Sequence, residues 1–174
     1  MSAAASLARH PIGPWALLLI AAACDDVTWV APQHTSDRLG VWVPEPGSTV
    51  LHADQSKLGN PTLVIVSDPA TWRALWTTTW GGMQAAPALP PVDFVLSSVV
   101  VVGMGTRAGL GYAVTIDSIV AHTVGAVLYA TETLPGAHCD ISASASAPVH
   151  MVHAPGHPPV VEWRVAPIRR DCSR

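Results

Sequence analysis

The sequence predicts an α+β fold, mainly antiparallel β-sheet in a sandwich or open-barrel arrangement, with one packed α-helix at about residues 68–80. Composition is the first observation behind this prediction. Sixteen prolines, 13 glycines and only 12% charged residues are unfavourable for a helical bundle and typical of a loop-rich β protein. The second observation is the order of the pattern, in which one helical segment is followed by a succession of apolar strands.

The helical segment has clear boundaries. Asp68 can accept hydrogen bonds from the first N–H groups, Pro69 suits the first helical position, and Gly81 can end the helix. Apolar side chains recur at spacings of three and four on one face, namely Trp72, Leu75, Trp76 and Trp80. Such a face is typical of a helix buried against a sheet, and a platform for sugar or aromatic ligands is the alternative.

Strands are expected where β-branched residues and alternating apolar positions occur. They cover residues 49–52, 62–66, 94–102, 112–120, 124–131, 149–153 and 160–165, with a weaker strand at 139–143. The strands at 94–102 and 112–120 are expected to form a hairpin, because only a short glycine-rich segment separates them.

That glycine-rich segment, residues 103–111, also has the glycine spacing of a dinucleotide-binding loop. Such a loop must open a helix, since the helix N-terminus holds the pyrophosphate. Here Tyr112, Val114 and Ile116 alternate with smaller residues, which indicates a strand. We therefore interpret the segment as a hairpin loop whose glycines have positive φ, and we expect no nucleotide and no other cofactor.

The N-terminal part of the chain has the pattern of an export signal. Residues 12–23 are apolar but too few to span a bilayer, which needs about 20 residues. Cys24 follows three alanines, and this arrangement resembles the bacterial lipobox, in which that cysteine is lipidated and begins the mature protein. An ordinary signal peptide with an incidental Cys24 is the alternative.

These features divide the chain into four parts. We expect a lipoprotein signal peptide at 1–23, a proline-containing tether at 24–47, a β-rich domain at 48–168 and a tail at 169–174. The expected location is the bacterial cell envelope, anchored by lipid on the periplasmic or outer surface side of a membrane. In that oxidising compartment Cys139 and Cys172 suggest one disulfide, and two free thiols are the alternative.

Five short motifs occur in the order and approximate spacing of a known family. They are Trp72-Arg-Ala-Leu-Trp76, Pro91-Val-Asp93-Phe94, the valine strand into Gly103, Arg107 to Gly111-Tyr112, and Ala147-Pro148-Val149-His150-Met-Val152. Together they resemble the PrcB-like C-terminal domain family, over about residues 48–165. The family takes its name from a lipoprotein subunit of a bacterial surface protease complex. The resemblance implies an accessory role, the binding and stabilising of an exported protease, and it brings no catalytic residues.

The residues themselves contain no serine elbow, no Cys-His signature and no His-Glu-x-x-His motif, so we expect no enzyme. A metal site is the alternative function, because imidazole and thiolate bind zinc. Its candidate ligands lie within twenty residues of each other, namely His138, Cys139, His150, His153 and His157. A strand at 149–153 would place His150 and His153 on opposite faces, which favours exposed or edge-strand histidines instead.

Protein binding is therefore the expected mode of action. The net charge of −3 and the scattered cations predict no nucleic-acid surface. Loops that join strands and incompletely buried aromatic residues are the natural contact points. On this basis the candidate partner-binding residues are Trp80, Thr106, Arg107 and Leu110.

Overall fold

The computed structural model describes residues 38–83, 86–137, 139 and 144–172. This part of the chain holds eight strands and one helix. In chain order they are β1 (Arg38–Trp42), β2 (Thr49–Ala53), β3 (Pro61–Val66), α1 (Pro69–Trp80), β4 (Ser97–Met104), β5 (Ala113–His122), β6 (Gly125–Pro135), β7 (Val149–Pro155) and β8 (Val160–Arg170). The expected signal peptide, Cys24 and most of the expected tether lie outside the described residues, as do residues 140–143 of the expected weak strand.

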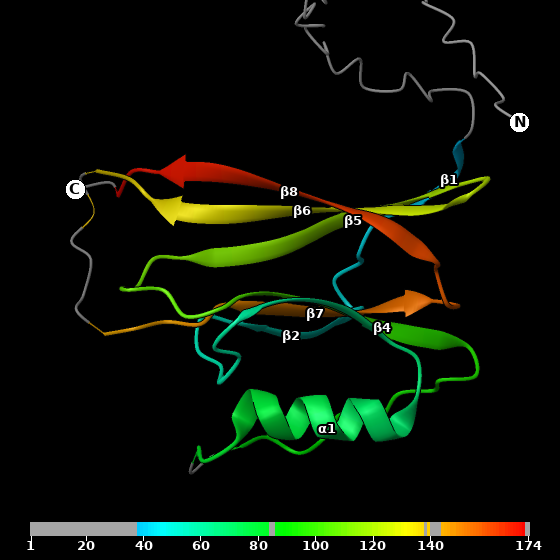
Figure 1. Ribbon diagram of the computed structural model, residues 1–174, viewed down its shortest axis with the longest axis horizontal. Helices are drawn as coiled ribbons and strands as arrows, with labels where there is room; N and C mark the ends of the chain where they lie inside the picture. The colour runs from blue at the N-terminus through cyan, green and yellow to red at the C-terminus, as the bar shows by residue number, and fades with distance from the viewer. Residues whose placement is uncertain (1–37, 84–85, 138, 140–143, 173–174) are drawn as a thin grey trace, which may run out of the picture. The chain divides into compact units, whose positions relative to one another are not determined.

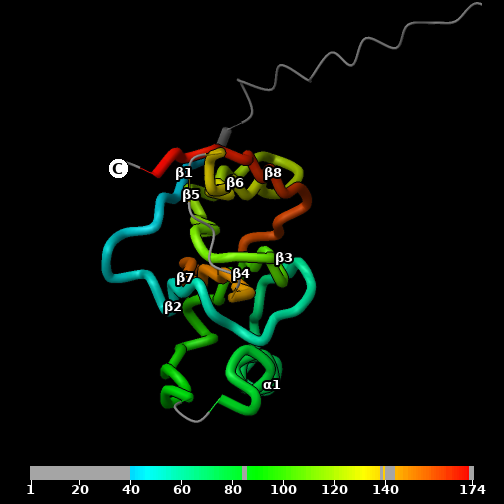
Figure 2. The backbone as a smooth tube through the Cα atoms, turned by 90° about the vertical axis from the view of Figure 1, so that its left-hand side faces the viewer, coloured from blue at the N-terminus to red at the C-terminus, as the bar shows by residue number. Residues whose placement is uncertain are grey.

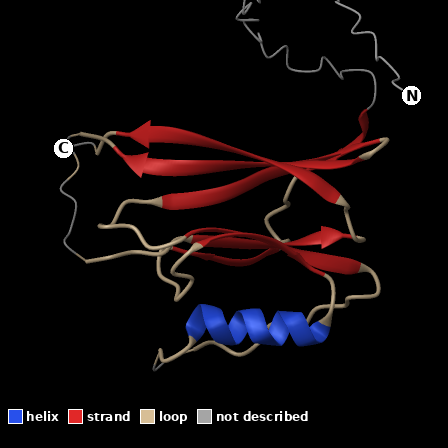
Figure 3. Ribbon diagram, in the orientation of Figure 1, coloured by secondary structure: helices blue, strands red, loops and turns tan. Residues whose placement is uncertain are grey.

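The strands form two four-stranded sheets that pack face to face (Figure 1). Sheet A has the strand order β1-β5-β6-β8, and sheet B has the order β2-β7-β4-β3. Neighbouring strands are antiparallel, except that β8 runs parallel to β6. The predicted α+β class is confirmed, in the form of a sandwich with a helix layer (Figure 3).

Sheet B is the middle of three layers, between sheet A and α1 (Figure 2). Successive residues of a strand face opposite sides, so β4 contributes to two cores. Val100 and Val102 pack toward sheet A, whereas Val99 and Val101 pack with the helix. All four valines are buried, because both faces of this central strand are covered.

The helix begins and ends where the sequence predicts. Asp68 caps it, since one carboxylate oxygen accepts the N–H groups of Ala70 and Thr71 at 2.9 Å each. Trp72 and Trp76 are 2% and 6% exposed and pack on sheet B. Their indole N–H groups donate to the carbonyls of Pro90 and Pro87, at 3.0 Å each. The stripe is therefore the buried face of α1, and at these two tryptophans the ligand-platform alternative is wrong.

The expected hairpin of residues 94–102 and 112–120 is wrong. β4 pairs with β3 and β7 in sheet B, whereas β5 pairs with β1 and β6 in sheet A. Residues 105–112 therefore cross from one sheet to the other. Gly105 and Gly111 have φ values of 71° and 89° in this crossing, the left-handed region that favours glycine. These two glycines serve a turn, as expected, whereas Gly103 lies in β4 and neither Gly103 nor Gly109 has a positive φ. The turn joins two layers and leads into a strand, not a helix.

Two boundaries differ from the sequence prediction. β1 lies inside the segment expected to be a tether, and it pairs with β5, for example Trp42 with Ile119. The strand β8 runs on to Arg170, into the expected tail, and pairs with β6 as far as Pro135. Both β1 and β8 are edge strands of sheet A. An edge strand pairs with a neighbour on one side only, so the sequences of these two segments show a weaker strand pattern.

Candidate functional site

All four candidate partner-binding residues lie at one end of the sandwich. β4 ends and β5 begins there, and α1 ends there as well, so Trp80, Thr106, Arg107 and Leu110 come from one helix end and one interlayer crossing. We call this end the loop end, defined by the described residues of 54–60, 105–112 and 136–148. In Figure 1 it is the left-hand end of the sandwich.

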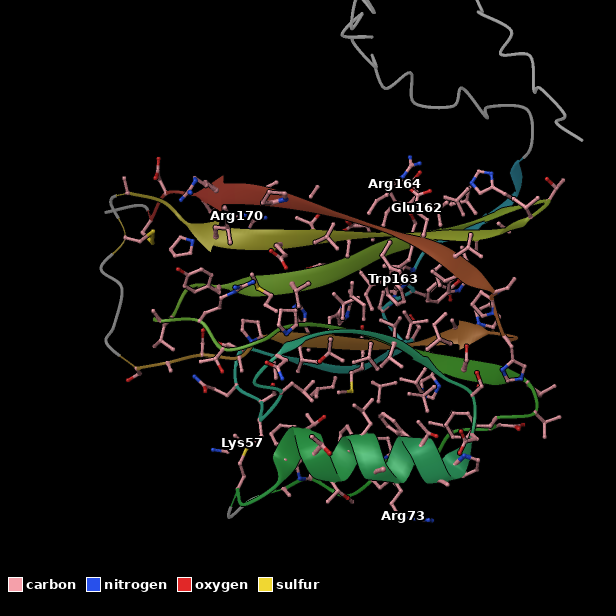
Figure 4. All side chains as sticks on the ribbon, in the orientation of Figure 1. Lys57, Arg73, Glu162, Trp163, Arg164 and Arg170 are labelled. Carbon is pink, nitrogen blue, oxygen red and sulfur yellow. A yellow bond between two sulfur atoms is a disulfide. The ribbon has the colours of Figure 1, made fainter. Side chains whose placement is uncertain are left out.

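Backbone hydrogen bonds hold the loop end together. Lys57 N–H donates to the carbonyl of Thr79 at 2.8 Å, and Thr106 N–H donates to that of Gly59 at 3.0 Å. Residues 57–59 thus join the end of the helix to the crossing. Figure 4 shows the Lys57 side chain projecting beside the helix end. The candidate contact residues are consequently held on hydrogen-bonded backbone rather than on a free loop.

A second set of hydrogen bonds fixes Arg107. Its backbone exchanges two hydrogen bonds with Ser146, at 2.7 and 3.0 Å, and the Ser146 hydroxyl donates to the carbonyl of Gly109. The side chain of Arg107 lies 3.8 Å (Nη2 to Oε1) from Glu132, with 31% and 25% of the two side chains exposed. Among the described residues, Arg107 Nε has no hydrogen-bond partner.

Thr106 and Leu110 flank this arginine and are both exposed. Leu110 keeps 38% of its surface in solvent. The loop end therefore presents an aliphatic side chain, a hydroxyl and a half-exposed guanidinium from one rigid turn. This combination suits contact with a protein surface, where an arginine at the centre of a patch is a common anchor.

Trp80 contributes less to this surface than the sequence suggests. It is half-buried, packs against the core of sheet B and α1, and meets the Trp76 ring edge-on with centroids 5.8 Å apart. Its indole Nε1 is buried without a partner among the described residues. Trp42 lies in the segment expected to be a tether, but it is half-buried against the core between the sheets and is not a free aromatic contact residue.

The histidine and cysteine candidates for a metal site are separated. Cys139 is joined to Cys172 in a disulfide, the pairing that the sequence suggests, and His138 lies outside the described residues. His150 and His153 belong to opposite faces of β7, and His157 is exposed in the loop after it. Within the described ranges no group of three or more His, Cys, Asp or Glu residues is arranged to hold a metal ion.

His52 is a neighbour of His150 that sequence reasoning missed. β2 pairs with β7 so that the two histidines are directly opposite, with ring centroids 4.5 Å apart. His150 is buried between the sheets, and its Nδ1 accepts the backbone N–H of Ile116 at 2.8 Å. No spacing in the sequence signals this pair, because it depends on the register of two strands nearly a hundred residues apart.

Burial, and then the neighbouring His52, lower the pKa of His150 from 6.5 to about 4. A neutral ring is required at this place, since Nδ1 can accept the Ile116 N–H only while it carries no proton. The pair thus has the chemistry of a pH-sensitive structural contact.

We expect the free energy of unfolding to fall by about 1–3 kcal/mol as the pH is lowered from about 6.5 to about 4. Between these values the unfolded chain binds a proton at His150 and the folded chain does not, so acid favours unfolding. Urea unfolding at several pH values measures the effect. His150→Gln retains an acceptor without titrating and should have a flatter pH dependence; an unchanged slope would contradict the assignment.

The described fold is a two-sheet sandwich with a helix layer, and its candidate site is the loop end. Comparisons of the chain with family models, with curated proteins and with solved structures find no match. Among the described residues no helix has the length and apolar character to cross a membrane.

Proposed function

We propose that this chain is a non-catalytic lipoprotein of the bacterial cell envelope whose β-rich domain binds and stabilises a protein partner. The partner class is the one that the resemblance to the PrcB-like family implies, an exported protease complex. The observation that carries the binding proposal is the loop end, where exposed Thr106 and Leu110 flank Arg107 on a hydrogen-bonded backbone. The anchor proposal depends on Cys24 after its apolar run.

The disulfide supports an oxidising compartment. Cys139 and Cys172 are 33 residues apart in sequence and lie with their Cα atoms 5.0 Å from each other. Disulfides persist mainly in extracellular and periplasmic proteins, because the cytosol keeps thiols reduced. The bridge also ties the end of β8 to the loop end, which restricts motion beside the proposed contact surface.

Capture of the partner should depend on Leu110 and Arg107. Leu110→Asp places a charge in the contact and should lower capture from crosslinked native envelopes by about tenfold. Leu89→Asp is the matched control, because Leu89 is 37% exposed and lies outside the loop end. Arg107→Ala is compared with Arg73→Ala, whose side chain projects from the outer face of α1 (Figure 4).

Equal capture by all four variants would refute the loop-end contact. Trp80→Ala is a less direct test, since Trp80 also packs in the core and its loss lowers stability. The competing metal-centred function is checked on the same preparation by measuring its zinc content and its hydrolytic activity with added zinc. Stoichiometric zinc in the protein, or turnover of a substrate, would favour the metal-centred function over the accessory role.

Cys24→Ala should move the protein from the membrane to the soluble periplasmic fraction. Lipidation on that cysteine is the proposed anchor, and the apolar run of residues 12–23 is too short to hold the chain by spanning the bilayer. Fractionation followed by immunoblotting measures the distribution. A variant that stays membrane-bound at full length would contradict the anchor.

A further inference from the structure

The end of the sandwich opposite the loop end carries an unusual group of exposed aliphatic side chains. Of the large apolar residues in the described ranges, the four most exposed are Val95, Leu96, Val124 and Val161, at 84%, 72%, 85% and 66%. We call these four the apolar tip. Val95 and Leu96 belong to the turn before β4, Val124 to the β5–β6 turn, and Val161 to the start of β8.

Two backbone hydrogen bonds attach the segment between β7 and β8 to this end of each sheet. Gly156 N–H donates to the carbonyl of Leu96 at 2.8 Å, and Ala126 N–H donates to that of Pro159 at 2.9 Å. The short segment 156–159 joins these two places, so the two turns lie at the same end of the sandwich, one in each sheet. In Figure 1 both turns are at the right-hand end of the sandwich.

A separate apolar pocket of about 260 Å³ lies near the same end of the sandwich, and none of the four tip residues lines it. Trp42, Ile119, Ala154, Pro155 and Pro158 are among the residues that line it. Glu162 follows Val161 directly, and its carboxylate accepts a hydrogen bond from Arg164 Nε at 2.6 Å. On the other side of the tip, the Asp93 carboxylate accepts the N–H of Val95 at 2.9 Å and so shapes the turn. The tip is thus a set of exposed aliphatic side chains on hydrogen-bonded turns.

The chain enters the domain at this same end. Arg38, the first described residue, pairs with His122, which directly precedes the β5–β6 turn. The first described residue of the domain is therefore at the end that carries the apolar tip, and 37 residues, which include the apolar run and Cys24, precede it in the sequence. A membrane anchor in those preceding residues would be joined to the domain at the end that carries the tip.

We propose that the apolar tip rests in the interfacial region of a lipid bilayer and directs the loop end away from the membrane. This inference rests on the proposed membrane anchor upstream of β1. A bilayer suits the tip better than a protein does, because the four tip residues include none of the Trp, Tyr or Arg side chains that anchor most protein contacts, whereas the loop end has Arg107. Aliphatic side chains on turns gain by transfer from water to the acyl boundary.

The test uses the full chain with Cys24→Ala and an N-terminal hexahistidine tag, held on phosphatidylethanolamine–phosphatidylglycerol vesicles that contain a nickel-chelating lipid. The nickel-chelating lipid holds the protein on the vesicle without lipidation. A negative result for membrane contact at the tip can therefore be distinguished from a negative result for the Cys24 anchor. An environment-sensitive fluorophore is attached through Val124→Cys or Leu96→Cys, without reductant, and through Leu110→Cys at the loop end as the control.

Doxyl-labelled lipid should quench the fluorophore about twofold at Val124 and Leu96 and leave it unchanged at Leu110, since interfacial side chains lie within reach of the acyl region. Absence of quenching at the tip, or equal quenching at all three positions, would overturn the proposal. A spectral change that depends on the density of protein on the vesicle, and not on the amount of doxyl-labelled lipid, would also overturn the proposal. It would indicate contact between two copies of the chain at the tip.

A second measurement uses vesicles without the nickel-chelating lipid. The fraction of the full-length Cys24→Ala chain that floats with phosphatidylethanolamine–phosphatidylglycerol vesicles should decrease by about tenfold when Val124→Asp and Val161→Asp are combined. The reason is that two exposed valines no longer enter the acyl boundary. Leu63→Asp is the control, since Leu63 is 45% exposed on β3, away from the tip. Equal losses for the tip variant and the control would contradict membrane contact at the tip.

Discussion

Replacing Trp72 by alanine should lower the free energy of unfolding by about 3–5 kcal/mol, the range for truncation of a fully buried aromatic side chain. Trp72 is 2% exposed and lies between α1 and the middle sheet, in a core with Val99, Val101 and Met151. Its loss would leave a cavity there and would leave the carbonyl of Pro90 without its indole donor.

Urea unfolding followed by circular dichroism measures this effect, with the slope of the transition checked for a change in the unfolded state. Arg73→Ala is the control, because it alters the next residue of the same helix on its exposed face, and it should change stability by no more than about 0.5 kcal/mol. A loss below about 1 kcal/mol for Trp72→Ala would mean that the helix is not packed on sheet B.

Removing the disulfide should be nearly as severe. The double variant Cys139→Ser with Cys172→Ser should lose about 3–4 kcal/mol, because the bridge closes a loop of 33 residues in the unfolded chain. Reductant should destabilise the wild-type domain to a similar extent and leave the double variant unchanged. If reductant does not move the wild-type unfolding midpoint, the two cysteines are free thiols in solution.

The parts of the fold that depend on local chemistry are predictable from the sequence. Asp68, Pro69 and Gly81 define the ends of α1, and the spacing of its tryptophans defines the buried face. The valine run of β4 likewise indicates a strand covered on both sides. In each case the residues that determine the structure are adjacent or a few positions apart.

The pairing of strands is not predictable in the same way. β4 and β5 are consecutive and joined by a short glycine-rich segment, yet they belong to different sheets. Alternation shows that a segment is a strand and which face is apolar, but it does not identify the neighbouring strand. The edge strand β1 was missed because its short sequence, with a glycine at its centre and prolines soon after, has the composition of a linker.

The candidate site shows the same division. Thr106, Arg107 and Leu110 were identified because a loop between strands is a natural contact surface. Their association with Ser146 and with the 57–59 segment depends on long-range hydrogen bonds that no motif encodes. The four residues of the apolar tip come from three separate turns or strand ends, so the patch exists only in the folded chain.

Site-specific photocrosslinking in native envelopes tests the proposed contact function most directly. A photoreactive amino acid is introduced at Leu110 in the loop end and, as the control, at Leu89, which has nearly the same exposure. We expect irradiation to give one discrete protein adduct from position 110 and none from position 89, with an exported protease or its complex identified in that adduct by mass spectrometry. No adduct at position 110, or the same adducts at both positions, would contradict a loop end that binds a specific partner.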